Sequence, residues 1–319
     1  MNKNLYILLI VCSFTFFSTQ TLATLSRSDA GKIRNGVKDK DLAMFIIKHS
    51  SRVFFNRKGM PIRLNMSKQK LTFLPENFAK LKSLRVLDLR KNNFDKIPAA
   101  VLALHNLEEL SLAGNSITNL PSAIANLNKL QTLNLRTNKL TKLPKSIGSM
   151  KNLRRLKLSS NKIHELPDEI ANMNSLVYLS ISNNDLNIFP MVVLNLFKLE
   201  SLVLIGNKIS ELPSNINKLR SLKNLQLYGT ELSTLPNNLC KLGKLEKMNV
   251  SNSKLRKLPK CIGDLKKLRV LEISSNKLLK MPNSICKLNS LKELDIRGNE
   301  ISKLPNCMNQ LRGLGKIKQ

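Results

Sequence analysis

The sequence predicts a curved α/β solenoid, with a parallel sheet on its concave face and short helical or irregular segments on its convex face. Three series of residues that recur in phase support this fold. Eleven of the twelve prolines follow one another in steps of 23 residues, from Pro75 to Pro305. Asparagine recurs with the same step from Asn92, and the pattern Leu-x-x-Leu-x-Leu, as in residues 130–135, recurs with it.

Residues 1–23 are typical of a signal peptide. Lys3 precedes a short apolar run over residues 5–17, and small residues at Thr21 and Ala23 favour cleavage after Ala23. The run is too short to span a membrane, and no later stretch is long enough, so we expect no transmembrane span in the mature chain. The alternative is a buried N-terminal helix. Export to the medium or the cell surface is the localisation that the leader predicts.

Residues 24–60 precede the repeats and are expected to cap the open end of the array. Residues 41–48 have helix-like apolar spacing after a potential N-cap at Asp39 or Asp41. The sequence therefore predicts a capping helix, with a helix that lies on a membrane surface as the alternative.

The repeat array is predicted over residues 61–319, with about ten full repeats and partial repeats at the ends. Alternation around Leu133 and Leu135 predicts a short strand with one inward face, and strands one period apart should pair in parallel. Ile124, Leu127 and their equivalents should enter the core from the convex side. Near the end of the chain, Leu314 and Ile317 fit the start of one more strand.

The recurring asparagine lies where the chain leaves each strand. Its amide both donates and accepts, so it can satisfy loop backbone groups that stacking would bury. The predicted ladder consists of Asn92, Asn115, Asn138, Asn161, Asn184, Asn207, Asn276 and Asn299. Thr230 and Ser253 replace asparagine at two consecutive steps, which predicts a weak seam between these repeats.

Residues 120–127, Leu-Pro-Ser-Ala-Ile-Ala-Asn-Leu, together with residues 130–138, resemble the leucine-rich-repeat family. The resemblance is to its 23-residue form, LPxxIxxLxxLxxLxLxxNxLxx, and it extends from Leu71 to Leu314. This form occurs in some bacterial surface proteins, in plant proteins and in an animal Ras-pathway scaffold. The resemblance implies a leucine-rich-repeat horseshoe that binds other macromolecules, and it does not indicate which partner.

No arrangement for catalysis is recognisable. The three histidines, His49, His105 and His164, do not share a slot of the repeat or lie at ligand spacing from one another. The array also leaves no room for an additional enzyme domain. We therefore expect no enzyme activity, no bound metal and no cofactor.

The concave strands should carry the residues that select a partner. Most outward positions hold Ser, Asn or Thr, but one apolar group and one basic group stand out. The predicted partner-binding residues are Tyr178, Val203, Ile205, Tyr228, Arg136, Arg155 and Lys157. Further along, Glu272, Glu293 and Asp295 make the last strands acidic. Random drift at exposed positions is the alternative explanation for the apolar group.

The chain has 53 Lys and Arg against 21 Asp and Glu, a formal charge of +32. Lysines recur in one slot after the asparagine, at Lys139, Lys162, Lys208, Lys254 and Lys277. This edge could bind an anionic glycan or lipid, or the lysines could simply form a solvated surface. Few aromatic residues lie among them, so nucleic acid is not indicated. An intracellular signalling scaffold is a further alternative, which requires that residues 1–23 are not a leader.

Four cysteines of the mature chain lie in the last repeats, as expected of an exported protein with paired cysteines. Equal slots two repeats apart are about 10 Å from each other, too far for a disulfide. Bridges between neighbouring repeats favour the pairs Cys240–Cys261 and Cys286–Cys307, which use the same geometry twice. The alternatives are a Cys261–Cys286 bridge and four reduced cysteines that pack as small apolar side chains.

Overall fold

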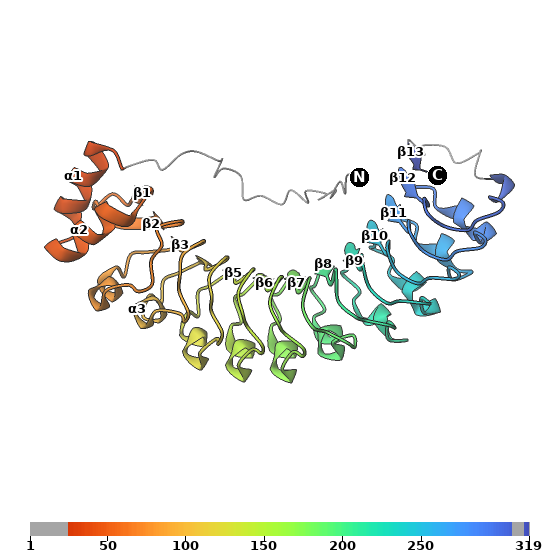
Figure 1. Cartoon of the computed structure of the whole chain (residues 1–319), viewed down its shortest axis with the longest axis horizontal. Coiled ribbons are helices and arrows are strands. Elements are labelled where there is room, and N and C mark those ends of the chain that lie inside the picture. Colours follow the sequence, from red (N-terminus) through yellow and green to blue (C-terminus); the bar gives the residue numbers. More distant parts are fainter. Residues whose placement is uncertain (1–24, 308–315, 319) are drawn as a thin grey trace.

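The structure is a computed structural model that describes residues 25–307 and 316–318. It confirms the predicted solenoid: an open arc with one sheet along its concave side and short helices along its convex side (Figure 1). The predicted signal peptide, residues 1–23, and Leu314 lie outside the described residues.

Within the described residues the sheet has thirteen strands in sequence order, and from β2 onward neighbouring strands pair in parallel with a shift of one 23-residue repeat. The strands are β1 (Arg52–Phe55), β2 (Pro61–Asn65), β3 (Val86–Asp88), β4 (Glu109–Ser111), β5 (Thr132–Asn134), β6 (Arg155–Lys157), β7 (Tyr178–Ser180), β8 (Ser201–Val203), β9 (Asn224–Gln226), β10 (Lys247–Asn249), β11 (Val270–Glu272), β12 (Glu293–Asp295) and β13 (Lys316–Lys318).

The convex side consists mainly of single turns of 3-10 helix. Most of these turns begin directly after the recurring proline, whose fixed φ suits the corner but cannot continue a strand. The turns η6 and η8 are shorter and begin two residues later. These elements are η1 (Glu76–Lys80), α3 (Ala99–Leu102), η2 (Ser122–Asn126), η3 (Lys145–Ser149), η4 (Asp168–Asn172), η5 (Met191–Asn195), η6 (Ile216–Lys218), η7 (Asn237–Lys241), η8 (Ile262–Asp264) and η9 (Asn283–Lys287).

A single continuous core runs through the array between the two sides. In the repeat that contains β5, Ile124, Leu127, Leu130, Leu133 and Leu135 are all fully buried. No repeat could bury this set alone, so each one depends on its neighbours for stability.

The N-terminal end is covered by two helices, α1 (Arg27–Gly36) and α2 (Lys40–His49), and by a hairpin of β1 and β2. The helix predicted at residues 41–48 is α2, and Asp39 is its N-cap because its carboxylate accepts the amide of Leu42. Asp39 also accepts from Lys80 and Asn77, which ties the cap to the first convex turn. The hydrogen bond from Lys80 is the main cause that lowers the pKa of the Asp39 carboxyl. The antiparallel strand β1 was not predicted from the sequence.

The asparagines at the strand exits all make the same contacts. The Nδ2 of Asn161 donates to the carbonyls of Leu135 and Leu158, at 3.0 and 2.8 Å, while its Oδ1 accepts the amide of Leu140 at 3.0 Å. The same contacts, one repeat apart, are made by Asn92, Asn115, Asn138, Asn184, Asn207, Asn276 and Asn299. Each side chain therefore joins backbone groups of neighbouring repeats.

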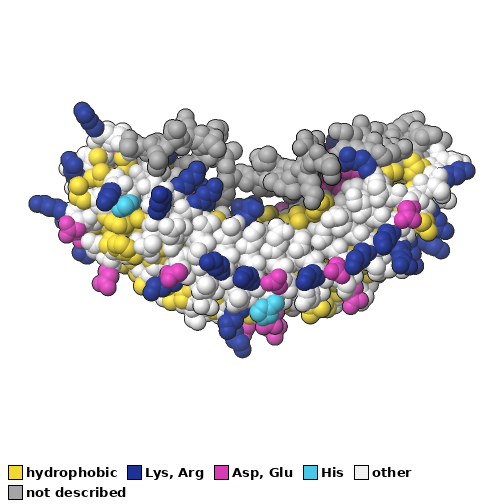
Figure 2. Space-filling model, in the orientation of Figure 1, with side chains coloured by type: hydrophobic (Ala, Val, Ile, Leu, Met, Phe, Trp, Pro, Cys, Tyr) yellow, Lys and Arg dark blue, Asp and Glu magenta, His cyan; other side chains and the backbone are white. Residues whose placement is uncertain are grey.

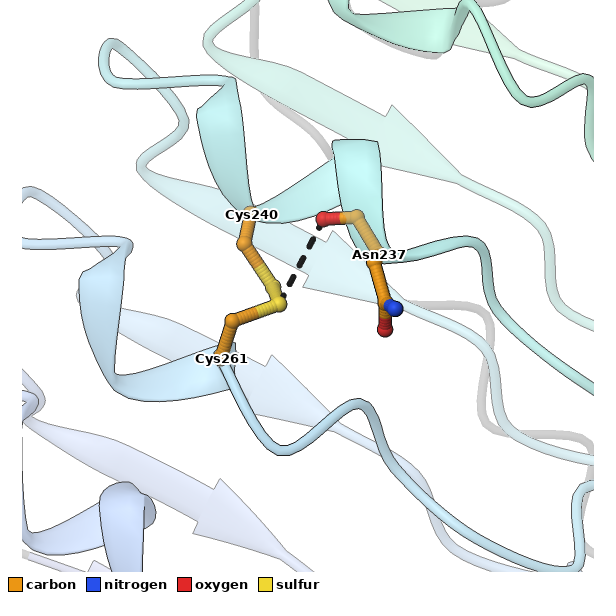
Figure 3. The surroundings of a disulfide bond; sticks show 3 residues. All are labelled: Asn237, Cys240 and Cys261. Atoms are coloured by element: carbon orange, nitrogen blue, oxygen red, sulfur yellow. Dashed lines mark hydrogen bonds between the residues drawn. A yellow bond between two sulfur atoms is a disulfide. The ribbon is translucent and has the colours of Figure 1, made fainter.

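The cysteines lie on the convex side, near the C-terminal end. A disulfide joins Cys240 in η7 to Cys261, which directly precedes η8, and their Cα atoms are 5.9 Å apart (Figure 3). The Sγ of Cys261 also lies 3.4 Å from the carbonyl oxygen of Asn237. A second disulfide joins Cys286 in η9 to Cys307, with the Cα atoms 6.0 Å apart. Each bridge therefore connects two consecutive repeats.

Candidate functional site: the concave face and its entry edge

The concave surface is built from the first and third residues of each short strand, because the middle residue points into the core. The third position is the more crowded of the two, since the curved sheet brings neighbouring side chains together on its inner side. Third-position residues that are buried are Asp88, Ser111, Ser180, Val203, Gln226 and Asp295.

Tyr178 and the basic residues form one cluster. Arg155 and Tyr178 are in register on β6 and β7, and the guanidinium carbon of Arg155 lies 4.8 Å from the centroid of the tyrosine ring. The ammonium of Lys157 lies 5.9 Å from the same centroid. Both distances allow cation–π attraction, which holds the aromatic ring and the two cations together as one half-buried surface. Arg136 lies one repeat earlier and is exposed.

The other three members of the predicted apolar group lie apart from Tyr178, at the exit ends of β8 and β9. Ile205 and Tyr228 follow these strands, and the hydrogen bond from the amide of Gly206 to the carbonyl of Tyr228 fixes the two turns side by side. Tyr228 is 44% exposed and Ile205 is half-buried. Val203 is only 6% exposed because it occupies the crowded third position, so it offers little area for contact.

The acidic end of the concave face is partly neutralised within the chain. The guanidinium of Arg297 lies 2.6 Å from the carboxylate of Asp295. The same pair recurs near the other end, where Arg90 lies 2.6 Å from Asp88 and the hydrogen bond raises the pKa of Arg90. Because Asp88 and Asp295 are each paired with an arginine, the cluster of Tyr178, Arg155 and Lys157 is the most distinctive surface between the two ends of the concave face.

A groove of about 550 Å³ lies beside this cluster, along the edge where the chain enters the strands. It is lined by Glu108, Lys129, Gln131, Asn152, Arg154, Ser175, Val177 and Lys198. Arg154 and Val177 directly precede Arg155 and Tyr178, so the groove and the concave cluster are continuous. The sequence analysis missed this groove, although its residues recur in two slots, immediately before and after the first leucine of each strand pattern.

The five lysines that follow ladder positions line the edge where the chain leaves the strands, which we call the exit edge. All five are exposed. Lys254 forms an ion pair with Glu231 at 3.1 Å, and Asp185 interrupts the row between Lys162 and Lys208. Figure 2 shows basic and acidic side chains interspersed along the face that it presents. The row is therefore not uniformly cationic.

The three histidines lie far apart, His49 in the capping helix α2 and the other two in different repeats. His49 packs against Phe45 with the ring planes tilted and the centroids 4.6 Å apart, and partial burial lowers the pKa of His49. His105 contacts the carbonyl of Asn126, and His164 lies 4.0 Å from Glu165. Over residues 25–307 and 316–318, no cluster of His, Cys, Asp and Glu could hold a metal ion. Within the same residues, no helix is both long and apolar enough to cross a membrane.

Family models match most of the repeats. The leucine-rich repeat region matches residues 104–193 and 188–276, and the leucine-rich repeat itself matches residues 267–288 and 290–311. The chain belongs to the leucine-rich-repeat family. No curated protein sequence matches this leucine-rich-repeat protein.

Solved structures with the same fold include binding proteins. A leucine-rich-repeat protein of Leptospira interrogans is 29% identical, with a TM-score of 0.54, over 80% of this chain and 83% of that one. The plant peptide hormone receptor RGFR1, in complex with RGF2, is 28% identical, with a TM-score of 0.65, over 83% of this chain and 51% of that one.

An internalin (inlF) of Listeria monocytogenes matches over 94% of this chain and 99% of its own length, at 20% identity and a TM-score of 0.54, and shares the fold alone. This leucine-rich-repeat protein spans only about half of the plant receptor's length. Its family and its structural neighbours are recognition modules, which is consistent with recognition of other proteins.

Proposed function

We propose that this protein is an exported, non-enzymatic recognition module that binds a protein partner on its concave face. The cluster of Tyr178, Arg155 and Lys157, beside the entry-edge groove, is the observation that carries the proposal. Interfaces favour aromatic side chains and arginine at their centres, and here both lie on a rigid sheet whose other outward residues are mostly small and polar.

Two features support export, and a third supports recognition of a partner. Residues 1–23 have the pattern of a leader, and the C-terminal repeats hold two disulfides, which persist in oxidising compartments. The plant receptor RGFR1 binds the peptide RGF2 through the same fold. A role in adhesion, host interaction or sensing follows from export together with recognition.

The test is capture of a partner by the mature chain, followed by measurement of its affinity for variants. Tyr178→Ala with Tyr228→Ala should weaken binding by more than about 2 kcal/mol if both side chains are hot spots. Leu279→Ser is the matched control, because this exposed apolar side chain lies outside the concave strands. An unchanged affinity of the double variant would contradict the assignment of the site.

The competing hypothesis is a binder of anionic glycan or lipid through the exit-edge lysines. Salt separates the two functions, because screening weakens contacts between exposed charges far more than contacts made by buried anchors. Release of the partner by about 0.5 M salt, with loss of binding in Lys139→Gln/Lys162→Gln, would favour the anionic ligand. Retention under these conditions supports the protein interface.

A further inference from the structure

One repeat in the middle of the array is apolar at convex positions where the other repeats are polar. Ile188, Met191 and Phe197 are 75%, 52% and 61% exposed, and we call these three residues the central patch. In the two neighbouring repeats, the slot of Ile188 holds Glu165 and Glu211, that of Met191 holds Asp168 and Ser214, and that of Phe197 holds Asn174 and Arg220. The core does not require these apolar residues, since the neighbouring repeats fold without them.

The segment that contains the central patch carries the opposite charge to the chain as a whole, although Arg220 holds the slot of Phe197 in the next repeat. Residues 163–213 contain six acidic residues and only two lysines, a net charge of −4, whereas the whole chain is +32. Asp168 and Glu169 lie in η4, which packs beside η5, the turn that begins with Met191. Glu169 also approaches Lys145, at 3.8 Å, on the surface. An apolar surface with an acidic rim fits an apolar surface with a basic rim.

Such a surface exists at the N-terminal end of the same molecule. Met44 and Phe73 are 54% and 64% exposed, and the ring centroid of Phe45, which follows Met44 in α2, lies 6.5 Å from that of Phe73. We call these three residues the cap patch. Figure 2 shows hydrophobic side chains gathered at this end of the molecule. Phe73 occupies the same slot as Ile188, which holds a polar residue in the repeats between them.

The rim of the cap patch is basic. Residues 25–80 contain thirteen Lys and Arg against four acidic residues, and one of these four, Asp39, is bound to Lys80. Of the eight large apolar side chains that are exposed in the described residues, three form the central patch, and Met44, Phe73 and Phe54 lie at the cap end. Phe54 is covered by the guanidinium of Arg52, 4.8 Å from its ring. The exposed apolar surface therefore concentrates in two places of opposite charge.

We propose that the cap patch of one molecule docks on the central patch of a second copy. The two patches of one molecule cannot meet, because β3, beside the cap patch, and β8 are five strand spacings apart, about 24 Å along the array. A symmetric contact between two central patches would bring two acidic rims together. The contact is therefore head-to-side, and because each copy keeps one unused patch, it propagates into chains or closes into a ring.

Sedimentation velocity of the exported chain tests this proposal. The average mass should rise with concentration beyond that of a dimer, between about 1 and 100 µM, and should fall when salt is raised from about 0.05 to 0.5 M, because the rims are charged. A monomer at every concentration and at both salt levels would overturn the proposal.

Two variants determine which surfaces meet, and except at Met44, which lies in α2, each replaces an apolar residue by one that another repeat holds in the same slot. The central variant is Ile188→Glu/Met191→Ser/Phe197→Asn, and the cap variant is Met44→Lys/Phe73→Lys. Each should be monomeric alone, with a thermal melt like that of the unmodified chain. An equimolar mixture should form a dimer and nothing larger, because one intact cap patch then meets one intact central patch. Leu279→Ser should self-associate like the unmodified chain.

Two results contradict the head-to-side contact. Self-association of the cap variant alone would show that central patches meet each other or that another surface is responsible. A mixture of two folded variants that stays monomeric would show that the two patches do not recognise each other.

Discussion

The repeats that contain Asn138 to Asn207 and the repeats from Thr230 to Cys307 have the same backbone but are joined by different chemistry. In the first region every strand exit is held by an asparagine that reaches into the neighbouring repeat. A hydroxyl contact of 2.6 Å between Ser159 and Ser180 adds to these bonds. The first region therefore has an uninterrupted hydrogen-bonded edge.

In the second region the edge is interrupted at two consecutive steps. The hydroxyl of Thr230 donates to the carbonyl of Leu227 at 2.9 Å and lies 3.0 Å from the hydroxyl of Ser253. Among the described residues, neither hydroxyl accepts a backbone amide, whereas asparagine at these positions would accept the amides of Ile209 and Leu232, two residues that are fully buried. Two short side chains thus replace a set of contacts that spans three repeats.

The Cys240–Cys261 disulfide links the convex segments that follow the strand exits of Thr230 and Ser253 along the chain. The bridge lies on the convex side, and the interrupted ladder lies at the strand exits. The disulfide therefore links the convex side of the same part of the array in which the strand exits have the fewest hydrogen bonds. The comparison indicates that neighbouring repeats are held together in two ways, by asparagine hydrogen bonds at the strand exits and by a disulfide on the convex side.

The largest effect should come from removal of that bridge. Cys240→Ser/Cys261→Ser should cost about 3 kcal/mol, from the entropy of a loop of 21 residues, because the weak seam is then held by one hydroxyl contact. Hydrogen exchange should accelerate between residues 227 and 262. Non-reducing peptide mapping of the exported protein comes first, with Cys240–Cys261 and Cys286–Cys307 as the expected links.

Cys286→Ser/Cys307→Ser is the matched control for this variant. It should loosen the end of the array and leave exchange at Thr230 unchanged. Four alkylatable thiols in the exported protein would rule out both bridges, and a Cys261–Cys286 link would show that the cysteines face the opposite neighbours.

Breaking the ladder in the first region should have the next largest effect. Asn161→Ala removes two donated bonds and leaves the buried amide of Leu140 without its acceptor, which should cost about 2 kcal/mol. Guanidinium unfolding measures the loss. Thr230→Ala serves as the comparison and should cost clearly less, because its hydroxyl donates one bond to the backbone; equal losses would mean that the two regions do not differ as described.

Completing the ladder in the second region should reverse the difference. Thr230→Asn/Ser253→Asn should add about 1 kcal/mol, because the amides of Ile209 and Leu232 regain acceptors. The melting temperature should rise, and exchange in these two loops should slow. A lower melting temperature, or unprotected loops, would contradict the existence of a seam.

Most of the fold could be predicted because a 23-residue period fixes strand pairing, register and inward positions at once. The burial of Val203 could not, since it depends on curvature that a single repeat does not encode. The sequence placed Tyr178 in the apolar group and Arg155 and Lys157 in the basic group, and it did not join them, because the contact of Arg155 with the ring crosses between strands. The entry-edge groove was missed because its lining residues are mostly polar and vary between repeats.

The sequence analysis also missed a backbone feature that recurs directly before each ladder position. This slot has positive φ, and it holds Gly114, Gly206, Gly229 and Gly298, but elsewhere Asn, Ser, Lys or Thr. Glycine adopts this conformation freely and asparagine tolerates it, whereas a β-branched residue is strained there. The recurring glycine and asparagine could have revealed the slot.

Thr137, with φ of 54°, is the β-branched residue in that slot and lies at the start of the otherwise well-held first region. Thr137→Asn should stabilise the protein by about 0.5 kcal/mol, because it relieves the strain while the amide at this position keeps its bond to the carbonyl of Ser159, 2.8 Å away. The reverse change, Asn183→Thr at φ of 50°, should destabilise the protein by a similar amount. Guanidinium unfolding of the two variants tests the pair, and only opposite signs are compatible with strain at this slot; a loss of stability in both would mean that contacts of the native side chains outweigh the backbone preference.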